Sequence, residues 1–496
     1  MIPLPPDRIL GVETEFGTYV EGNHFDQPEA AVEALKDAVF YDLKLGLIDL
    51  HARDEMFEPR LKGGFLTNGG RLYIDAVGTH LEYATPEVRS IRDLIRFNRA
   101  GQRIIRRAIK LLGMEDEIDV YNNSVDHFGG HTFGCHENYL AWMEDDYFTT
   151  RVAYLIPFLV TRQVFAGAGR VGGHVLYTDG SGPSHDQMSQ HPEDYIWVSQ
   201  VYDVEPDPDV EFQISQRADH LLKPVAGRVR FNRALINPKW EHFYSMDRAH
   251  RLHLLLGEAN QSQYAEALKV GSTRLVMRMI EDDSEPDGIL MPRPMRELRE
   301  VSRDLTLTHR CELLGETTAT ALEIQFRYLE SAQGYRGESE ETDWILDEWE
   351  STLHGLSTDI PSMRDRIDWV AKYTMLNQVR EENGWSWSED ALQSYDLEYH
   401  NIDPNRSLAG ALEQMGELRT IVGEVEVAEA ETTPPDNTRA KSRGEFVRKT
   451  LQNPKRKVYM IDWNAIVTGP HGVVEMQDPF ATYDDDIENS LKKLPE

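Results

Sequence analysis

The sequence has little cysteine and no long apolar run. Its two cysteines, Cys135 and Cys311, belong to no CxxC or Cys/His spacing, which excludes a disulfide framework and a structural zinc site. No run of about 18 apolar residues occurs, and the N-terminal residues lack a basic segment followed by a long apolar stretch. We therefore expect a soluble, cytoplasmic protein.

Basic residues are also scarce. The chain has 52 lysines and arginines against 85 acidic residues, which gives a formal net charge of −33. A surface of this charge repels phosphate and gains nothing from counterion release. This argues against a general role on nucleic acids or anionic membranes, although local basic patches remain possible.

The chain has 496 residues, more than one hydrophobic core usually supports. Residues 424–438 are acidic and then rich in threonine and proline, a composition typical of a linker or an exposed loop. We therefore predict a large domain at residues 1–424 and a small C-terminal domain at residues 425–496.

The glycine-rich motifs of the common nucleotide folds are missing too. There is no GxxxxGK[ST] stretch, and no GxGxxG opens a helix after a strand, so a P-loop or Rossmann site for ATP is not expected. Carboxylates gather instead on two segments that alternate like strands. In residues 8–20, Glu13 and Glu15 share one face of a strand that we expect to end near Gly17.

The second of these segments has two different faces. Arg71, Tyr73 and Asp75 share one face of the predicted strand. Leu72 and Ile74 share the other face, which is suited to a hydrophobic core.

Two further carboxylates, Glu82 and Glu87, follow within twelve residues of Asp75. Neighbouring carboxylates repel one another and raise each other's pKa unless a cation joins them. Oxygen ligands without thiolates suit Mg²⁺, which combines carboxylates with waters and substrate phosphates. The residues favour an antiparallel sheet that presents carboxylates to metal-bound ATP, although glutamates alternating as Glu13 and Glu15 do are also typical of a solvent-exposed strand face.

A helix with a basic face is predicted at residues 90–113, with Ser90 as its N-cap and Gly113 as its stop. Its polar face carries seven basic residues: Arg92, Arg96, Arg99, Arg103, Arg106, Arg107 and Lys110. Such a face is either solvated or a docking surface for an acidic partner, and we favour the solvated face.

Other elements follow from periodicity and composition. Residues 171–210 are rich in glycine, proline, serine and aspartate and predict a long loop or hairpin insertion. Trp463 is predicted to lie in a strand, where it either stacks on a base or, more commonly, fills the core. The remaining predictions are helices at 150–165, 262–283, 316–380 and 439–452 and a strand at 457–469.

Several polar side chains are candidates for binding phosphate or carboxylate groups. Arg217 follows Ser215 and Gln216 in one segment, and Arg251 and His253 alternate in another. Arginines beside strands are equally typical of structural ion pairs, so these residues remain secondary candidates.

Ten segments together resemble the family of the bacterial Pup ligase and its relative, the Pup deamidase/depupylase. The resemblance spans nearly the whole chain, in the family's order. The segments are GVETEFG (11–17), LTNGGRLYID (66–75), HLEYATPE (80–87), YNNSVD (121–126), GCHENYL (134–140), PFLVTRQVFAGAGRV (157–171), SQRADH (215–220), RLHLLLGEAN (251–260), ALKVGSTRLV (267–276) and TRAKSRGEF (438–446).

The resemblance implies an α+β, glutamine-synthetase-like fold: a curved antiparallel sheet flanked by helices, with a small C-terminal domain that contributes to the nucleotide site. It implies ATP and Mg²⁺ as cofactors, and phosphorylation of the C-terminal glutamate of a small Pup-like modifier. A lysine of a protein substrate then attacks the acyl phosphate, which gives an isopeptide bond.

The resemblance also implies roles for individual residues. Asp75 would be the catalytic base. The implied Mg²⁺ ligands are Glu13, Tyr73 and Glu82, and the implied ATP contacts are Arg71, Thr85, Arg443 and Trp463. The secondary candidates for the site are Glu15, His80, Arg217, Arg251 and His253.

Three alternatives to the ligase remain open on sequence. The family's hydrolase branch removes the tag or deamidates its terminal glutamine, but motifs such as ETEFG and RGEF look more like the ligase branch. A scaffold could bind an acidic chain with the basic helix, and a small-molecule carboxylate–amine ligase is possible because residues 237–247 depart from the family pattern.

Overall fold

The computed structural model describes most of the chain. The described residues are 8–22, 25, 27–48, 62–75, 80–125, 127, 132–143, 145–173, 209–227, 233–242, 249–453, 460–468 and 472–493. Most of the predicted insertion (residues 174–208) and residues 243–248 lie outside these ranges. Within them, no helix combines the length and apolar character needed to cross a membrane.

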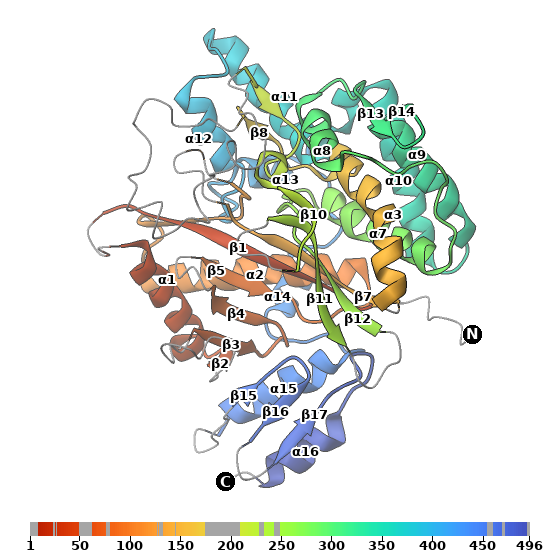
Figure 1. Cartoon of the computed structure of the whole chain (residues 1–496). Helices are drawn as coiled ribbons and strands as arrows, with labels where there is room; N and C mark the ends of the chain where they lie inside the picture. Colours follow the sequence, from red (N-terminus) through yellow and green to blue (C-terminus); the bar gives the residue numbers. More distant parts are fainter. Residues whose placement is uncertain are drawn as a thin grey trace, which may run out of the picture.

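A ten-stranded sheet forms the centre of the described structure (Figure 1). The strands run in the order β10-β11-β12-β7-β1-β5-β4-β3-β2, with β6 also paired to β1. Their bounds are β1 Leu10–Val20, β2 Gly46–Ile48, β3 Gly63–Leu66, β4 Arg71–Ile74, β5 Leu81–Ala84, β6 Ile118–Tyr121, β7 Cys135–Trp142, β10 Lys223–Val225, β11 Ala234–His242 and β12 Ala249–Leu254. All these pairs are antiparallel except β10 with β11, which is parallel. The predicted α+β class is confirmed, with one parallel pair that was not predicted.

Strand β1 is longer than predicted. Its first part pairs with β5 and β7, and the part from Gly17 to Val20 pairs with β6. The prediction that the strand ends near Gly17 is wrong, because a third partner strand supplies the hydrogen bonds beyond it.

Helix α2 (Ile91–Leu112) covers the apolar face of the sheet. Ser90 caps its first turn by accepting a hydrogen bond from Asp93 N–H at 3.0 Å, and Gly113 ends it in the left-handed conformation with φ 68°. Both predicted helix ends are confirmed. Leu72 packs with Phe16 and Ile105 in the core between α2 and the strands, so the opposite sheet face is left for polar side chains.

A second group of helices packs beyond the sheet and appears at the upper right of Figure 1. It includes α3 Asp145–Thr161, α7 Gln263–Glu281, α8 Pro294–Arg303, α9 Ala321–Ala332 and α10 Glu340–Thr358, and α11 Asp368–Asn383 lies at the top of the figure. The helices predicted near 150–165 and 262–283 are confirmed. The predicted helical region 316–380 instead begins with strand β14 (Thr317–Thr320), which pairs with β13 (Arg310–Leu313) in a hairpin.

The predicted linker is a docked helix. Helix α14 (Glu424–Ala430) packs on α2 and buries Val427 and Ala430 in the main core. Glu431, at its C-terminal end, is 3% exposed and binds Arg103 and Arg107 of α2.

The basic face of α2 is therefore not simply solvated, because the chain's own acidic segment covers part of it. Arg92 pairs with Glu426 at 2.8 Å, and Arg99 pairs with Glu413 at 2.8 Å. The preference for a solvated face is wrong for Arg99, whose side chain is 17% exposed, but it agrees with Arg92, whose side chain is 54% exposed. Opposite charges on the two helices, together with the apolar side of α14, explain the docking. The boundary at residue 424 stays a prediction.

The C-terminal elements form a small layer beside β2 and β3, drawn in blue at the bottom of Figure 1. They are α15 Arg439–Leu451, β15 Met460–Ile461, β16 Ala465–Val467, β17 Val473–Glu475 and α16 Asp484–Lys493. The helix predicted at 439–452 is confirmed. The single strand predicted at 457–469 is wrong: β15 and β16 pair antiparallel, and Trp463 lies in the turn between them.

Candidate active site

Strand register brings the predicted metal ligands onto one face of the sheet. Tyr73 on β4 lies opposite Glu82 on β5, and Glu82 lies opposite Glu15 on β1. Directly paired residues on neighbouring strands project from the same face. Glu13, two residues before Glu15, projects from that face as well. The hypothesis required the side chains of Glu13, Tyr73 and Glu82 to face the same way, and they do.

Glu82 is a carboxylate of this group whose charged form is disfavoured by its surroundings. It is 4% exposed, and burial together with Glu13, Glu15 and Asp75 holds the pKa of Glu82 well above its usual value. Burial and the neighbouring Glu82 also raise the pKa of Tyr73. Such a desolvated acidic group is stabilised when a divalent cation joins its oxygens. The donor set therefore fits Mg²⁺.

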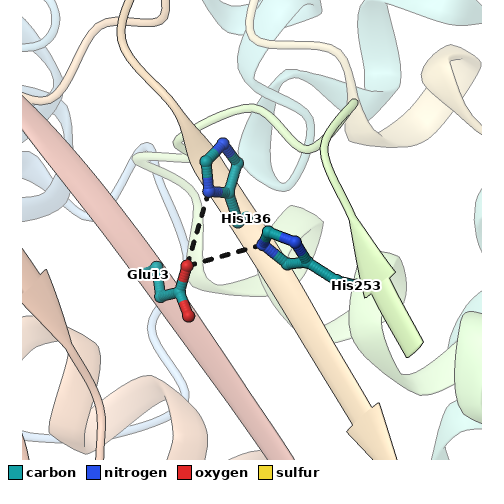
Figure 2. A group of neighbouring side chains, drawn as sticks. All are labelled: Glu13, His136 and His253. Atoms are coloured by element: carbon teal, nitrogen blue, oxygen red, sulfur yellow. Dashed lines mark ion pairs between the residues drawn. The ribbon is translucent and has the colours of Figure 1, made fainter. Parts of the chain in front are cut away.

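Glu13 lies against two histidines (Figure 2). Its Oε2 is 3.4 Å from His136 Nδ1 and 3.5 Å from His253 Nε2, and the three residues come from β1, β7 and β12. Burial opposes the charged form, but the two nearby imidazoles and Arg251 outweigh it and hold the pKa of Glu13 well below its usual value. Burial lowers the pKa of His253 to about 4. Neutral imidazole nitrogens and a carboxylate oxygen together are suitable ligands for a divalent metal ion.

His136 is a site residue that the sequence analysis did not select. It lies directly opposite Glu13 in the pairing of β1 with β7. The alternation of His136 with Asn138 was visible in the sequence, but only the register shows that Glu13 is their neighbour. Asn138 Nδ2 donates to Glu13 Oε1 at 3.1 Å.

Asp75, the predicted catalytic base, lies in a second acidic cluster with Glu15 and His80. Ligand atoms of the three residues lie within 4.8 Å of one another. His80 Nδ1 is 3.0 Å from Glu15 Oε2, and this contact outweighs burial to hold the pKa of Glu15 at about 2. Asp75 N–H donates to His80 O at 3.0 Å, so its backbone position is fixed at the end of β4. Asp75 is half-buried.

Two of the predicted nucleotide contacts come together around Phe65. The Arg71 guanidinium lies 5.3 Å from the centre of the Phe65 ring, and the Trp463 ring packs edge-on against Phe65 at 5.0 Å. Thr85 directly follows strand β5, and its Oγ1 accepts a hydrogen bond from Val12 N–H at 3.1 Å. Trp463 is thus neither in a strand nor in the interior, but borders the polar face.

Arg443 does not present its guanidinium to this face. It is 0% exposed, and it donates to Gly69 O at 2.8 Å, to Trp463 O at 2.8 Å and to the carboxylate of Glu87. The predicted phosphate contact of Arg443 is not supported, because its donors already have partners. Its position suits a structural role in holding the Trp463 turn, a role that the sequence analysis missed along with that of Glu87.

The two secondary arginines have different environments. Arg251 lies 3.0 Å from Asn138 Oδ1 and 3.5 Å from Glu13 Oε1, so it joins the histidine cluster. Arg217 is 6% exposed, donates to Phe133 O at 3.1 Å, and forms no ion pair with a carboxylate among the described residues. Burial disfavours the charged guanidinium and lowers the pKa of Arg217. A buried guanidinium without a carboxylate partner is suited to binding an anionic ligand.

Known proteins resemble this chain over almost its full length. The sequence pattern of the family described as Pup-ligase protein matches residues 8–467. Proteins named Pup--protein ligase from Kineococcus radiotolerans and Sanguibacter keddieii are each 32% identical to it, over 98% of this chain and 99% of theirs.

Solved structures agree with the sequence matches. The structure of the Pup ligase PafA in complex with Pup superposes with a TM-score of 0.78 and 29% identity, covering 98% of this chain and 91% of that one. The structure of PafA with ADP gives a TM-score of 0.74 at 29% identity, covering 95% of each chain. With its carboxylate-lined sheet face and these matches, the chain belongs to the Pup ligase family.

Proposed function

We propose that this protein is an ATP-dependent ligase that joins the C-terminal glutamate of a small Pup-like modifier to lysines of protein substrates. The observation that carries the proposal is the row of Tyr73, Glu82 and Glu15 across three adjacent strands. The relatives named Pup--protein ligase and the PafA structures with Pup and with ADP support the same activity.

Two groups of residues would hold divalent cations. Glu82, Tyr73 and Glu13 form one oxygen-rich group, and Glu13 also belongs to the group with His136 and His253. Mg²⁺-bound ATP supplies the phosphoryl group that turns the modifier's carboxylate into an electrophile. The protein's part is to hold oxygen donors in fixed positions on rigid strands, so that little reorganisation is needed during the reaction.

The remaining residues would orient the reactants. Arg217 is the buried cation suited to a carboxylate or phosphoryl oxygen of the modifier's terminal glutamate. Arg71 and Trp463 border the same face beside Phe65, where a guanidinium and an aromatic ring suit a nucleotide. Phosphate groups are strong acceptors for such a guanidinium.

Asp75 would be the general base. An attacking lysine is protonated at neutral pH and must lose a proton before its nitrogen can form an amide bond. Asp75 can accept that proton because its carboxyl group lies at the edge of the acidic cluster and is not fully buried. One proton of the ammonium group passes to Asp75 before the nitrogen attacks. The second leaves the nitrogen for solvent as the amide forms, and the phosphate departs with the electron pair of the broken acyl–oxygen bond.

The test is incubation of the purified protein with Mg²⁺, ATP, a Pup-like modifier ending in glutamate and a lysine-bearing protein. We expect ADP release together with a conjugate whose mass is that of both proteins minus one water. Asp75→Asn should abolish conjugation and leave ADP binding within about threefold. Asp37→Asn is the matched control, because Asp37 is exposed on helix α1 (Pro28–Asp37). Cleavage of a preformed conjugate without conjugation would instead assign the hydrolase activity.

A further inference from the structure

A third cluster of side chains that carry metal-ligand atoms lies away from the polar sheet face. Glu297 on helix α8 meets His309 and Cys311, which are two residues apart at the start of strand β13. Glu297 Oε2 is 2.9 Å from His309 Nε2, and the ligand atoms of all three residues lie within 4.8 Å of one another.

The donor atoms match those of protein zinc sites. Zinc binds cysteine sulfur at about 2.3 Å and histidine nitrogen or carboxylate oxygen at about 2.0 Å, which places tetrahedral ligands roughly 3.5 Å apart. The histidine and carboxylate atoms are 2.9 Å apart, and no separation in the cluster exceeds 4.8 Å, so small side-chain movements would bring the three donors to one ion. A hard ion such as Mg²⁺ is disfavoured by the sulfur ligand.

Burial of the Glu297 carboxylate favours binding of a cation by the cluster. Glu297 is 2% exposed and Cys311 is 0% exposed. In the described part of the chain, His309 is the one basic side chain in ion-pair contact with Glu297. A buried carboxylate without lysine or arginine is costly to desolvate, and a bound cation offsets that cost.

Access to the cluster comes from the histidine side. The His309 side chain is 26% exposed, while that of Glu297 is 3% exposed. An ion can therefore enter past the imidazole, and the solvent side leaves room for a water as fourth ligand.

We propose that Glu297, His309 and Cys311 bind one zinc ion, with water as the fourth ligand. Zinc replaces the thiol proton of Cys311, which is released to solvent, and no electron is transferred. The exclusion of a structural zinc site from cysteine spacing is therefore wrong if this site binds zinc. Spacing rules miss it because Glu297 comes from α8, while His309 directly precedes β13 and Cys311 lies in β13.

The bound ion would tie the β13–β14 hairpin to the helix that supports Arg217. Ser302 of α8 accepts hydrogen bonds from Ser215 N–H at 3.0 Å and from Ile214 N–H at 2.7 Å. Arg303 of the same helix pairs with Asp219 at 3.0 Å. The role of the ion is thus to stabilise the fold behind the Arg217 segment.

The test uses the full-length protein, stripped of metal with a chelator and then kept in Mg²⁺ and ATP. Titration with Co²⁺ should give a near-ultraviolet thiolate-to-metal charge-transfer band that saturates at one ion per chain. Because the sequence has two cysteines, Cys311→Ser should abolish the band and Cys135→Ser should keep it. One equivalent of Zn²⁺ should raise the melting temperature of the wild type and of Cys135→Ser, but not of Cys311→Ser.

A histidine pair provides a second control that leaves both thiols intact. His309→Ala should weaken Co²⁺ binding at least about tenfold, whereas His354→Ala should not, because the His354 side chain is 64% exposed on α10. No charge-transfer band in the folded wild type would overturn the proposal. A band that persists in Cys311→Ser would overturn it as well. Co²⁺ bound by Glu13 and the histidines of the polar face gives no thiolate band, so the result is independent of the proposed ligase activity.

Discussion

Arg443 in helix α15 donates a hydrogen bond to Glu87, which lies just beyond strand β5 in the large part of the molecule. The pair is buried, and Arg439 donates to the same carboxylate at 2.8 Å. Arg443 also donates to the carbonyls of Gly69 and Trp463. One buried carboxylate thus links the C-terminal layer to the sheet edge that borders the proposed nucleotide site.

Removal of one partner from this link should destabilise the protein strongly. In Arg443→Ala, Glu87 keeps only Arg439, and the carbonyls of Gly69 and Trp463 lose their donor. We expect a loss of about 3–5 kcal/mol in the free energy of unfolding, the usual cost of breaking a buried ion pair. Urea unfolding measures it. Arg92→Ala is the control, because the Arg92 side chain is 54% exposed in its pair with Glu426, and its loss should cost less than about 1 kcal/mol. Equal losses in the two variants would contradict the structural role of Arg443.

The same pair predicts a pH dependence of stability. Burial alone would raise the pKa of Glu87, but Arg443 and Arg439 outweigh it and hold the pKa at about 2, against an ordinary value of 4.5. The folded state therefore binds the proton less readily than the unfolded state does. The stabilisation is complete above about pH 4.5 and is lost as the pH falls toward about 2. It amounts to roughly 3 kcal/mol if the whole shift is realised.

This dependence is isolated by comparing the wild type with Glu87→Gln in urea unfolding at several acid pH values. The difference in unfolding free energy should shrink as the pH falls through the window between the two pKa values. A difference that stays constant across that window would mean that the charge of Glu87 contributes nothing to stability.

Substitution of Glu82 should separate stability from activity. Glu82→Gln removes a buried carboxyl group whose ionisation is opposed by burial and by Glu13, Glu15 and Asp75. Without divalent cations, this variant should be at least as stable as the wild type in urea. With Mg²⁺ and ATP, its conjugation rate should fall at least about 100-fold, because a preorganised oxygen ligand is lost. A destabilised variant that keeps its activity would remove Glu82 from the metal site.

Local patterns in the sequence predicted what depends on neighbouring residues. The alternation around Tyr73 identified a strand with one apolar and one polar face, and the cap at Ser90 and the stop at Gly113 located helix α2. These features depend on backbone geometry within a few residues, so the sequence alone contains them.

Contacts between distant segments could not be predicted in this way. His136 meets Glu13 only through the register of β7 with β1, and Trp463 lies in a turn because two short strands pair around it. Arg443 matched a family motif, but the sequence did not show that Glu87 occupies its donors. Composition also gave a wrong prediction at residues 424–438. An acidic segment looks solvent-exposed when its basic partner is unknown, and Arg107, a partner of Glu431, lies 324 residues away in the sequence.

The docking of the acidic helix α14 on the basic helix α2 can be tested by reversing one charge. Glu431 is 3% exposed and binds both Arg103 and Arg107, so Glu431→Lys would bury a third positive charge beside two others. We expect a loss of about 3–5 kcal/mol in the free energy of unfolding. Glu429→Lys makes the same charge change at an exposed position of the same helix, where surface substitutions usually stay within about 0.5 kcal/mol. Because net charge changes equally in both variants, the difference between them reports the buried contact alone. Equal stability of the two variants would show that residues 424–438 are a linker after all.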